Sequence, residues 1–448
     1  MTLAWRSRAG AILACSGLIQ LGVAALPDTM ADLQTYRAWT RTLAAGGLSA
    51  AYWPPAPAGF HLPIDYPPLF PYVLWGVGRT LAAVSAESLA HDDRLLDFLI
   101  RVPLVASLLL LGLLVRSEAR RRAPGTEDFA LASIVLNPAL LFDTAYWGQA
   151  DAPCALLLVA AIVAVVRGRL EWGWASMTAA VLVKPLAAPF IPLLALLTLR
   201  RFGGRRLVGA FAAAMAVLFL VLLPFAALGR VGDALSAFVV QLDAMPYASV
   251  DAHNLWWLAT GGLPWTPSAA RLGGLVPLTT VSLVLFGVFA VGVWSRMTRS
   301  ADPAAPYVGA ASIALGFFML ATRMHENHLF AAVPLLALAV PLPSRRFLFV
   351  FLFSATLLAN MALHDPFLTA VLRPHVPGPH LLRPQQPEVP AELLSYLVDG
   401  GYPWVAARIR GETSRLGYAL TFVNAGANLV FFAAWLRAAY RKRGEPLV

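Results

Sequence analysis

Long apolar runs separated by short basic clusters make up most of the chain. Stretch 172–199 has arginines at both ends and a Lys184-Pro185 step in its middle, where proline interrupts a helix. We predict two short helices there that meet near Lys184. With the other apolar runs, this predicts an all-α polytopic membrane protein with about twelve transmembrane helices. The other runs lie at 9–26, 98–115, 128–146, 151–166, 207–228, 275–295, 306–322, 328–342, 347–363 and 417–436.

The composition agrees with a membrane protein and argues against other classes. The chain has 448 residues, 59% hydrophobic and 13% charged, with a mean hydropathy of +0.68, which is too apolar for a soluble core. The net charge of +10 lies in clusters between apolar runs, so no nucleic-acid partner is expected. Cys15 and Cys154 both fall in apolar runs, which argues against a disulfide framework or a cysteine metal site. The run at 9–26 follows Arg6 and Arg8 and could pass for a signal peptide, but with many spans behind it we interpret it as a retained first helix.

Lys and Arg are more numerous in the segments that this pattern places inside. By the positive-inside rule, we expect a plasma (inner) membrane protein with both termini in the cytoplasm. Three long segments then face outward, at 27–97, 229–274 and 364–416. We expect a single integral membrane domain, 1–448. Residues 69–88 could be another span, but we favour helices along the outer surface, carried by the long first extracytoplasmic loop. All eight histidines fall in or beside outer segments.

Two groups of candidate site residues lie in the first outer loop. Asp32, Tyr36 and Trp39 are spaced i, i+4 and i+7, so a helix puts them on one face. A carboxylate beside aromatic rings suits a base that receives a proton from a sugar hydroxyl, although a helix-end acid with interfacial aromatics has the same pattern. Asp65 and Tyr66 precede paired prolines and are candidates to bind sugar or only to shape the loop.

A third group is "DTAYWGQAD" at 143–151, which we predict to be a tight outer turn between two spans with Gly148 giving conformational freedom. Acids and amides can bond hydroxyls, and flat apolar rings can cover a sugar. Asp151 could instead cap the following helix. The candidate binding residues here are Tyr146, Trp147, Gln149 and Asp151.

The fourth group is "DAHNLWW", beginning at Asp251, whose tryptophan pair is also typical of an interfacial belt. The fifth is "RMHENH", with Arg323, His325 and His328 at the predicted outer end of a span. The zincin motif spaces its histidines i, i+4, whereas these are i, i+3, which argues against zinc. An arginine with two imidazoles suits a phosphate instead, and a solvated helix end stays the alternative.

The early acidic residue Asp32, then "DYPP", "YWGQAD", "DAHNLWW" and "HENH" in that order resemble the GT-C superfamily of membrane glycosyltransferases. The nearest resemblance is to the dolichyl-phosphate-glucose-dependent glucosyltransferases of N-glycan assembly, whose "HEKH" has a lysine where this chain has Asn327. The many arginines and compact loops look bacterial.

This resemblance implies a GT-C fold and inverting transfer of a sugar, mannose or glucose, from a polyprenyl-phosphate donor to an acceptor hydroxyl at the extracytoplasmic face. Asp32 would be the general base in building a cell-envelope glycan, facing a phosphate clamp across the site. The partners are the lipid-linked donor, a glycan or lipid-linked acceptor and the bilayer, with no cofactor and no metal. The clamp is implied to be Arg323, His325 and His328; sugar and acceptor contacts are implied at Tyr36, Asp65, Tyr66, Tyr146, Trp147, Gln149, Asp151 and Asp251.

Two other functions fit parts of the pattern. A lipid-linked sugar flippase would place ionisable residues along a midplane pathway, yet Lys184 is the one clear ion inside a predicted span, while acids and histidines gather at one face. A non-catalytic scaffold that binds a lipid phosphate would use Arg323 and leave Asp32 without a task.

Overall fold

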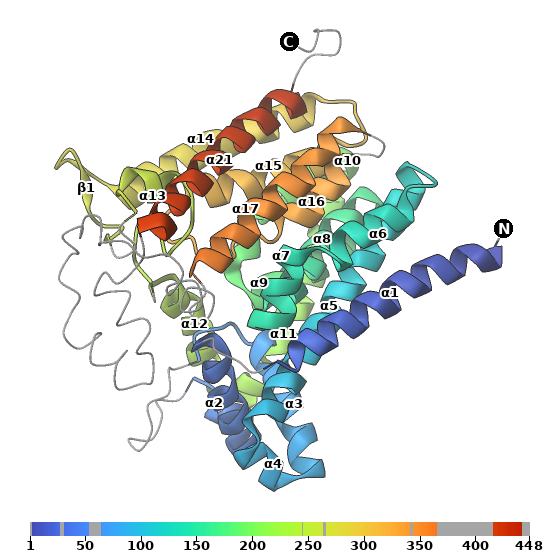
Figure 1. Ribbon diagram of the computed structural model, residues 1–448, viewed down its shortest axis with the longest axis vertical. Helices are drawn as coiled ribbons and strands as arrows, with labels where there is room; N and C mark the ends of the chain where they lie inside the picture. The colour runs from blue at the N-terminus through green and yellow to red at the C-terminus, as the bar shows by residue number, and fades with distance from the viewer. Residues whose placement is uncertain are drawn as a thin grey trace. The chain divides into compact units, whose positions relative to one another are not determined.

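The computed structural model describes residues 2–26, 31–52, 64–243, 245–262, 266–340, 344–364 and 415–440. These residues form helices almost throughout, which confirms the all-α prediction (Figure 1). The sheet found among them is one antiparallel pair, β1 (Arg271–Leu272) with β2 (Val276–Pro277). Most of the predicted outer segment 364–416 lies outside the described residues.

Two compact units make up the chain. The first comprises Met1–Ala244, Ala301–Ala310 and Val333–Phe347, and the second comprises Met245–Ser300, Ala311–Ala332 and Leu348–Val448. The single domain expected from the sequence stays a prediction.

The first unit contains the helices that carry the first three polar groups. In Figure 1, α2, α3 and α4 lie together, and α1 runs beside α5. Its elements are α1 (Thr2–Ala24), α2 (Ala31–Gly46), η1 (Gly47–Ala50), α3 (Leu69–Val84), α4 (Ala86–His91), α5 (Asp93–Arg122), α6 (Glu127–Val135), α7 (Pro138–Leu141), η2 (Phe142–Trp147), α8 (Asp151–Val166), α9 (Leu170–Val183), η3 (Pro185–Phe190), α10 (Ile191–Phe202), α11 (Gly204–Ala227), α12 (Val231–Asp243) and η4 (Arg345–Phe347).

The second unit carries the Asp251 and Arg323 loops. Within it, α17 packs against α21, as their parallel course in Figure 1 shows. Its elements are α13 (Leu255–Ala259), β1, β2, α14 (Leu278–Arg299), α17 (Leu348–His364) and α21 (Arg415–Tyr440), while α15 (Ala305–Leu320) and α16 (Ala332–Ala339) have residues in both units.

Side-chain caps and charge explain where several helices start and stop. Asp92 accepts a hydrogen bond from a first-turn amide of α5, and arginines 120–122 complement the dipole at its other end. Asn137 caps α7, and Pro138 follows at the first helical position, where no amide hydrogen is needed. Asn254 caps the short α13. These caps place the polar loops at fixed points along the chain.

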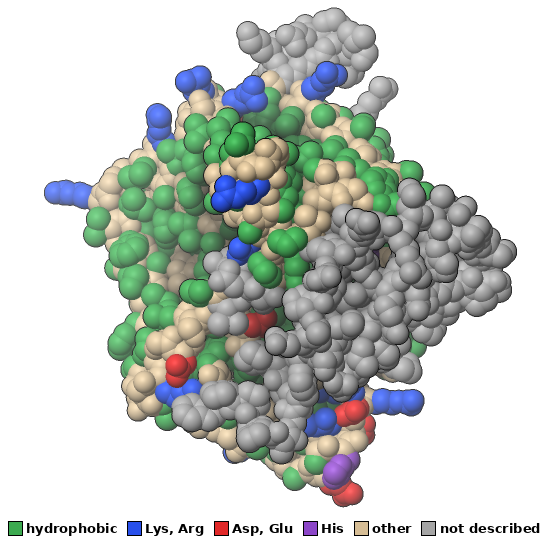
Figure 2. Space-filling model, turned by 90° about the vertical axis from the view of Figure 1, so that its left-hand side faces the viewer, with side chains coloured by type: hydrophobic (Ala, Val, Ile, Leu, Met, Phe, Trp, Pro, Cys, Tyr) green, Lys and Arg blue, Asp and Glu red, His purple; other side chains and the backbone are tan. Residues whose placement is uncertain are grey.

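Five segments among the described residues are long and apolar enough to cross a membrane: Asp93–Arg122, Pro185–Phe202, Gly204–Ala227, Leu278–Arg299 and Gly417–Tyr440. Figure 2 shows hydrophobic side chains spread widely over the coloured part of the visible surface. Helices α11 and α14 expose many large hydrophobic side chains, as expected of helices that face lipid. The chain therefore has the fold of a multi-pass membrane protein, and the expected twelve spans stay a prediction. Large exposed apolar side chains on these two helices include Phe211, Phe219, Leu220, Leu283, Val284 and Val288.

Two predicted spans differ from the structure. The run 128–146 is not one helix, because Asn137 starts a new turn and the pair of helical segments around it bends by 42°. The run 328–342 is helical over 332–339 alone, because the residues just before it form tight turns, in which the His328, Phe330 and Ala332 amides each donate to a carbonyl three residues earlier. The predicted break near Lys184 is confirmed: α9 ends at Val183, and Lys184 is extended, with φ −152° and ψ 127°.

Candidate active site

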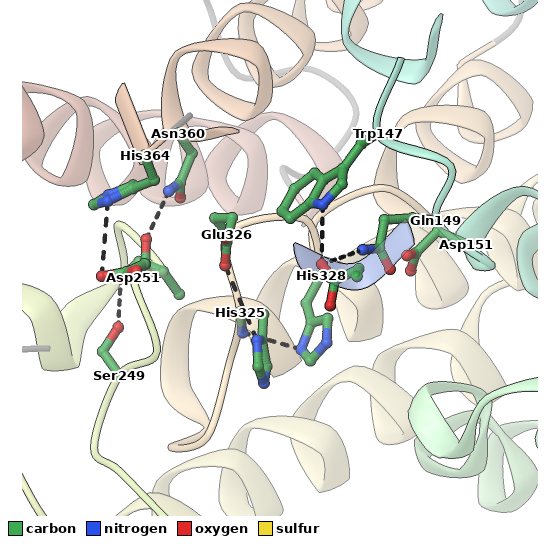
Figure 3. Close-up of polar contacts among 12 residues, drawn as sticks. Trp147, Gln149, Asp151, Ser249, Asp251, His325, Glu326, His328, Asn360 and His364 are labelled. Atoms are coloured by element: carbon green, nitrogen blue, oxygen red, sulfur yellow. Dashed lines mark hydrogen bonds and ion pairs between the residues drawn. The ribbon is translucent and has the colours of Figure 1, made fainter. Parts of the chain in front are cut away.

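In the first unit, Asp32 receives two hydrogen bonds on one carboxylate oxygen. Trp147 Nε1 donates to Oδ2 at 2.9 Å, and Gln149 Nε2 donates to the same atom at 2.8 Å. Figure 3 shows both side chains directed at this acceptor. Among the described residues, no hydrogen bond reaches the second oxygen, Oδ1. The carboxylate is thus oriented through one oxygen while the other can receive a proton.

The turn that supplies both donors depends on Gly148. Residues 142–147 form one π-helical turn, and Gly148 ends it in the left-handed region at φ 80°. A Cβ there would lie 3.2 Å from a Leu33 methyl group, so both the backbone and the space favour glycine. The expected conformational freedom at Gly148 is confirmed. Because α2 carries both Leu33 and Asp32, the turn packs closely on the helix that holds the carboxylate.

Aromatic rings line the same helix. The sequence spacing of Asp32, Tyr36 and Trp39 predicted a shared helical face, and α2 is confirmed as a helix. Tyr36 and Trp39 are buried, with ring centroids 5.5 Å apart. The Tyr36 hydroxyl lies 3.0 Å from the Tyr66 hydroxyl and 3.4 Å from Gln149 Oε1. Tyr36 therefore joins the "DYPP" loop to the amide that binds Asp32.

Burial changes the protonation of two carboxyl groups, Asp32 on α2 and Asp65 on the "DYPP" loop. Burial raises the pKa of Asp32, and the Trp147 hydrogen bond, the positive charge of Lys184 and the Gln149 hydrogen bond lower it in part. Burial also raises the pKa of Asp65 to about 7. Both carboxyl groups hold protons more tightly than exposed aspartates do, which suits a group that must take a proton near neutral pH.

A buried ion pair lies where the turn ends and α8 begins. Lys184 Nζ is 2.8 Å from Asp151 Oδ2, and the two side chains are 6% and 2% exposed. Asp151 is the first residue of α8, where the helix dipole favours a negative charge. The sequence analysis placed Lys184 inside a predicted span and made Asp151 a candidate sugar contact. In the structure the Asp151 carboxylate is paired with Lys184.

Arg101 is a second buried cation that the sequence analysis missed. Its side chain is 1% exposed. It donates to the Ala24 and Leu26 carbonyls at 2.8 and 3.2 Å and to the Tyr146 carbonyl at 2.7 Å. Arg101 therefore ties the end of α1 to the turn below Asp32. Its position inside the apolar run 98–115 is the signal that could have identified it.

In the second unit, the Arg323 segment is an irregular loop that is bonded to the Asp251 loop. The Arg323 amide donates to the Tyr247 carbonyl at 3.0 Å, and the Val250 amide donates to the Met324 carbonyl at 2.9 Å. Arg323 and Asp251 both adopt left-handed φ values, 63° and 62°. The fourth and fifth sequence groups thus form one structural element. Arg323 is partly exposed in it, and its Nε donates to Ser268 Oγ at 3.4 Å.

The two histidines of this loop differ in their hydrogen bonding. The His325 amide donates to His328 Nδ1 at 3.2 Å, which leaves the His328 hydrogen on Nε2 when the ring is neutral. His325 Nδ1 lies 4.0 Å from Glu326 Oε2, and Figure 3 shows these side chains together. His328 can therefore donate a hydrogen bond without being charged.

A histidine pair fixes the Asp251 side of the same element. Asn424 Nδ2 donates to His253 Nδ1 at 2.8 Å, so the His253 hydrogen is on Nε2, which faces His364 Nε2 at 2.8 Å. The His364 hydrogen is then on Nδ1, 3.7 Å from Asp251 Oδ1. Asn360 also donates to the Asp251 carbonyl at 2.7 Å. The sequence placed His253 and His364 at the outer face but gave neither a role.

The sequence-predicted residues thus fall into two separate groups. The described residues contain no cluster of three or more His, Cys, Asp or Glu side chains placed to hold a metal ion, and metal independence stays a prediction. In the first unit the structure brings together Asp32, Tyr36, Tyr66, Trp147 and Gln149, with Asp65 and Tyr146 on the same loops and Asp151 behind them; in the second it brings together Asp251, Arg323, His325 and His328.

Comparison with known proteins identifies the fold. No protein-family model and no characterised protein sequence matches the chain. Among solved structures, the chain is similar to the crystal structure of ArnT from Cupriavidus metallidurans bound to undecaprenyl phosphate. The two share 16% sequence identity with a TM-score of 0.51, over 98% of this chain and 78% of that one. The chain therefore has the GT-C fold expected from its sequence.

Proposed function

We propose that the protein is an inverting glycosyltransferase that moves a sugar from a polyprenyl-phosphate carrier to an acceptor hydroxyl at the extracytoplasmic membrane face. The observation that carries this proposal is the Asp32 carboxylate, oriented by Trp147 and Gln149 through one oxygen. The ArnT structure contains undecaprenyl phosphate, and a likeness in fold to a protein that binds such a lipid supports a polyprenyl-phosphate donor here.

In the proposed reaction, the acceptor oxygen attacks the anomeric carbon of the donor sugar. The bond between that carbon and the phosphate oxygen breaks, and the phosphate leaves with the electron pair. Asp32 Oδ1 takes the proton from the acceptor hydroxyl as its oxygen forms the new bond. One displacement inverts the anomeric centre, and proton and charge balance because the base is protonated while the phosphate gains a negative charge.

The leaving phosphate needs positive charge or hydrogen-bond donors, and we assign this role to Arg323, His325 and His328. The loop geometry supports the assignment, because Arg323 is partly exposed and His328 has a hydrogen on Nε2. Tyr36, Tyr66, Tyr146, Asp65 and Asp251 are proposed to bind sugar or acceptor. Mannose or glucose is the expected sugar.

The test is transfer by the purified protein in lipid nanodiscs. Polyprenyl-phosphate mannose, glucose and arabinose are each offered with an extract of cell-envelope glycans and lipid-linked acceptors, and the glycosidic product is measured. Asp32→Asn keeps the size of the side chain and removes the base, so we expect a loss of at least about 100-fold. A folded Asp32→Asn protein that transfers sugar as fast as wild type would rule out the base.

A flippase is the alternative function. The same purified protein, reconstituted into vesicles, distinguishes a flippase from a glycosyltransferase. Movement of labelled donor lipid between leaflets with no glycosidic product identifies a flippase. Activity that survives exhaustive chelation supports metal-independent transfer, and activity that one divalent ion restores refutes it.

A further inference from the structure

The Lys184–Asp151 ion pair has no part in the proposed chemistry, although it is the most buried pair of opposite charges near Asp32. Lys184 is 5% exposed and Asp151 2% exposed. Burying two charges costs several kcal/mol, and exchange for apolar residues of similar size is often neutral or stabilising. Fold stability alone therefore does not explain why this pair lies here rather than two leucines.

The pair is connected to Asp32 through two residues of chain and one hydrogen bond. Gln149, which binds Asp32 Oδ2, is two residues before Asp151 in the same turn. Lys184 stands at the break between α9 and η3, and its carbonyl lies 3.7 Å from Cys154 Sγ on α8. The ion pair thus joins the start of α8 to the end of α9 at the point where the turn enters α8.

We propose that Lys184 and Asp151 are positioning residues for Asp32: their ion pair anchors the turn that carries Trp147 and Gln149, and it places one positive and one negative charge behind the carboxylate. This inference deepens the proposed function, because it gives the base of that reaction its setting. Neither residue contacts substrate in this assignment.

The two charges act on Asp32 in opposite directions. The Lys184 charge lowers the pKa of Asp32, and the Asp151 charge raises it, whereas the neighbouring hydrogen bonds from Trp147 and Gln149 lower it. Other ionisable groups around the pair are Tyr66, Asp143, Asp65 and Cys154. Removing one partner at a time should therefore shift the pKa of Asp32 up or down, according to which charge is lost.

The experiment measures the titration of Asp32 without substrate. Thermal unfolding midpoints are recorded from pH 4 to 9 for wild type, Lys184→Met and Asp151→Asn, each with and without Asp32→Asn. Because the pKa of Asp32 is raised in the folded protein, the stability that its proton contributes is full at low pH and is lost as pH rises through the folded pKa. The difference between each protein and its Asp32→Asn partner therefore reports that pKa.

We expect the Asp32 transition to move up by about one pH unit in Lys184→Met and down by about one pH unit in Asp151→Asn. Shifts in the same direction, or no shift in either variant, overturn the inference. The matched control is Glu118→Gln, which removes a buried carboxylate paired with Arg167 at 2.7 Å. Glu118 lies about 25 Å along α5 from Arg101, at 1.5 Å of rise per residue, so its variant should leave the Asp32 transition in place.

A single variant that fails to fold leaves a second test, the charge-free double variant Lys184→Met/Asp151→Asn, which keeps the side-chain sizes and removes both charges. Its Asp32 transition should stay within about half a pH unit of wild type, while transfer kcat falls about tenfold with KM unchanged, because the anchor is lost and no substrate contact is. A double variant with wild-type kcat overturns the anchoring role. If wild type transfers no sugar but the opposite shifts appear, the proposed function fails and the positioning inference stands.

Discussion

Trp147→Phe isolates one hydrogen bond to the proposed base. The ring keeps its aromatic packing, but the Nε1 hydrogen that reaches Asp32 Oδ2 at 2.9 Å is lost. A hydrogen bond to a charged group is worth about 1.5–3 kcal/mol, and one pKa unit corresponds to about 1.4 kcal/mol. Since this bond favours the ionised carboxylate, its loss should raise the pKa of Asp32 by about one to two units.

The assay is transfer kcat/KM from pH 5 to 9 in nanodiscs. We expect the acidic limb of the profile to move up by about one to two pH units, with activity at high pH reduced by less than at pH 7. The matched control is Trp174→Phe, because Trp174 is also buried and its Nε1 bonds the neutral Thr198 hydroxyl at 3.1 Å. An unchanged limb in Trp147→Phe, or the same shift in Trp174→Phe, would refute the reasoning.

Three further predictions follow from the described geometry. Burial raises the pKa of Asp65 from 3.8 to about 7, so the stability that its bound proton contributes is full below pH 3.8 and is lost by pH 8. Asp65→Asn should therefore raise the thermal unfolding midpoint relative to wild type at pH 8 and leave it nearly unchanged at pH 4. Gly148→Ala adds a Cβ 3.2 Å from a methyl group at φ 80°, so it should lower transfer and destabilise by more than Gly229→Ala, which has a positive φ of 69° and open space and should show only the strain of about 1 kcal/mol. Equal losses of unfolding free energy in the two variants would contradict this. Arg323→Gly relieves a left-handed φ of 63° and should raise the thermal midpoint while reducing transfer at least about tenfold; unchanged transfer would remove Arg323 from phosphate binding.

Local spacing predicted part of the candidate site because helix geometry is regular. The i, i+4, i+7 spacing from Asp32 put Tyr36 on the same helix face, and the structure has that helix. Gly148 was predictable because a tight turn needs a left-handed residue. By contrast, the pairing of Asp151 with Lys184 depends on how α8 packs against α9, which no spacing along the chain contains.

Hydropathy also predicted one continuous helix in each of two runs that the structure breaks, because an average over a run ignores single caps and turns. Asn137 and Pro138 lie in an apolar run, yet the amide side chain starts a new helical turn there and the chain bends. Near His328 the run continues toward 342, but the His328 and Phe330 amides donate to carbonyls three residues earlier, which closes tight turns. The helix begins after these turns, at Ala332.

Backbone strain gives an independent reason to regard the Asp251–Arg323 element as functional. A left-handed φ costs a non-glycine residue about 1 kcal/mol or more, and glycine would remove that cost at either position. Asp251 and Arg323 nevertheless occupy these positions. Two loop-to-loop backbone hydrogen bonds and the His253–His364 pair stabilise the strained backbone. The backbone alone would favour glycine at both positions, so the retained side chains fit the roles proposed for them. Arg323 is partly exposed and ends in a guanidinium, a group that forms strong, charge-assisted hydrogen bonds to phosphate.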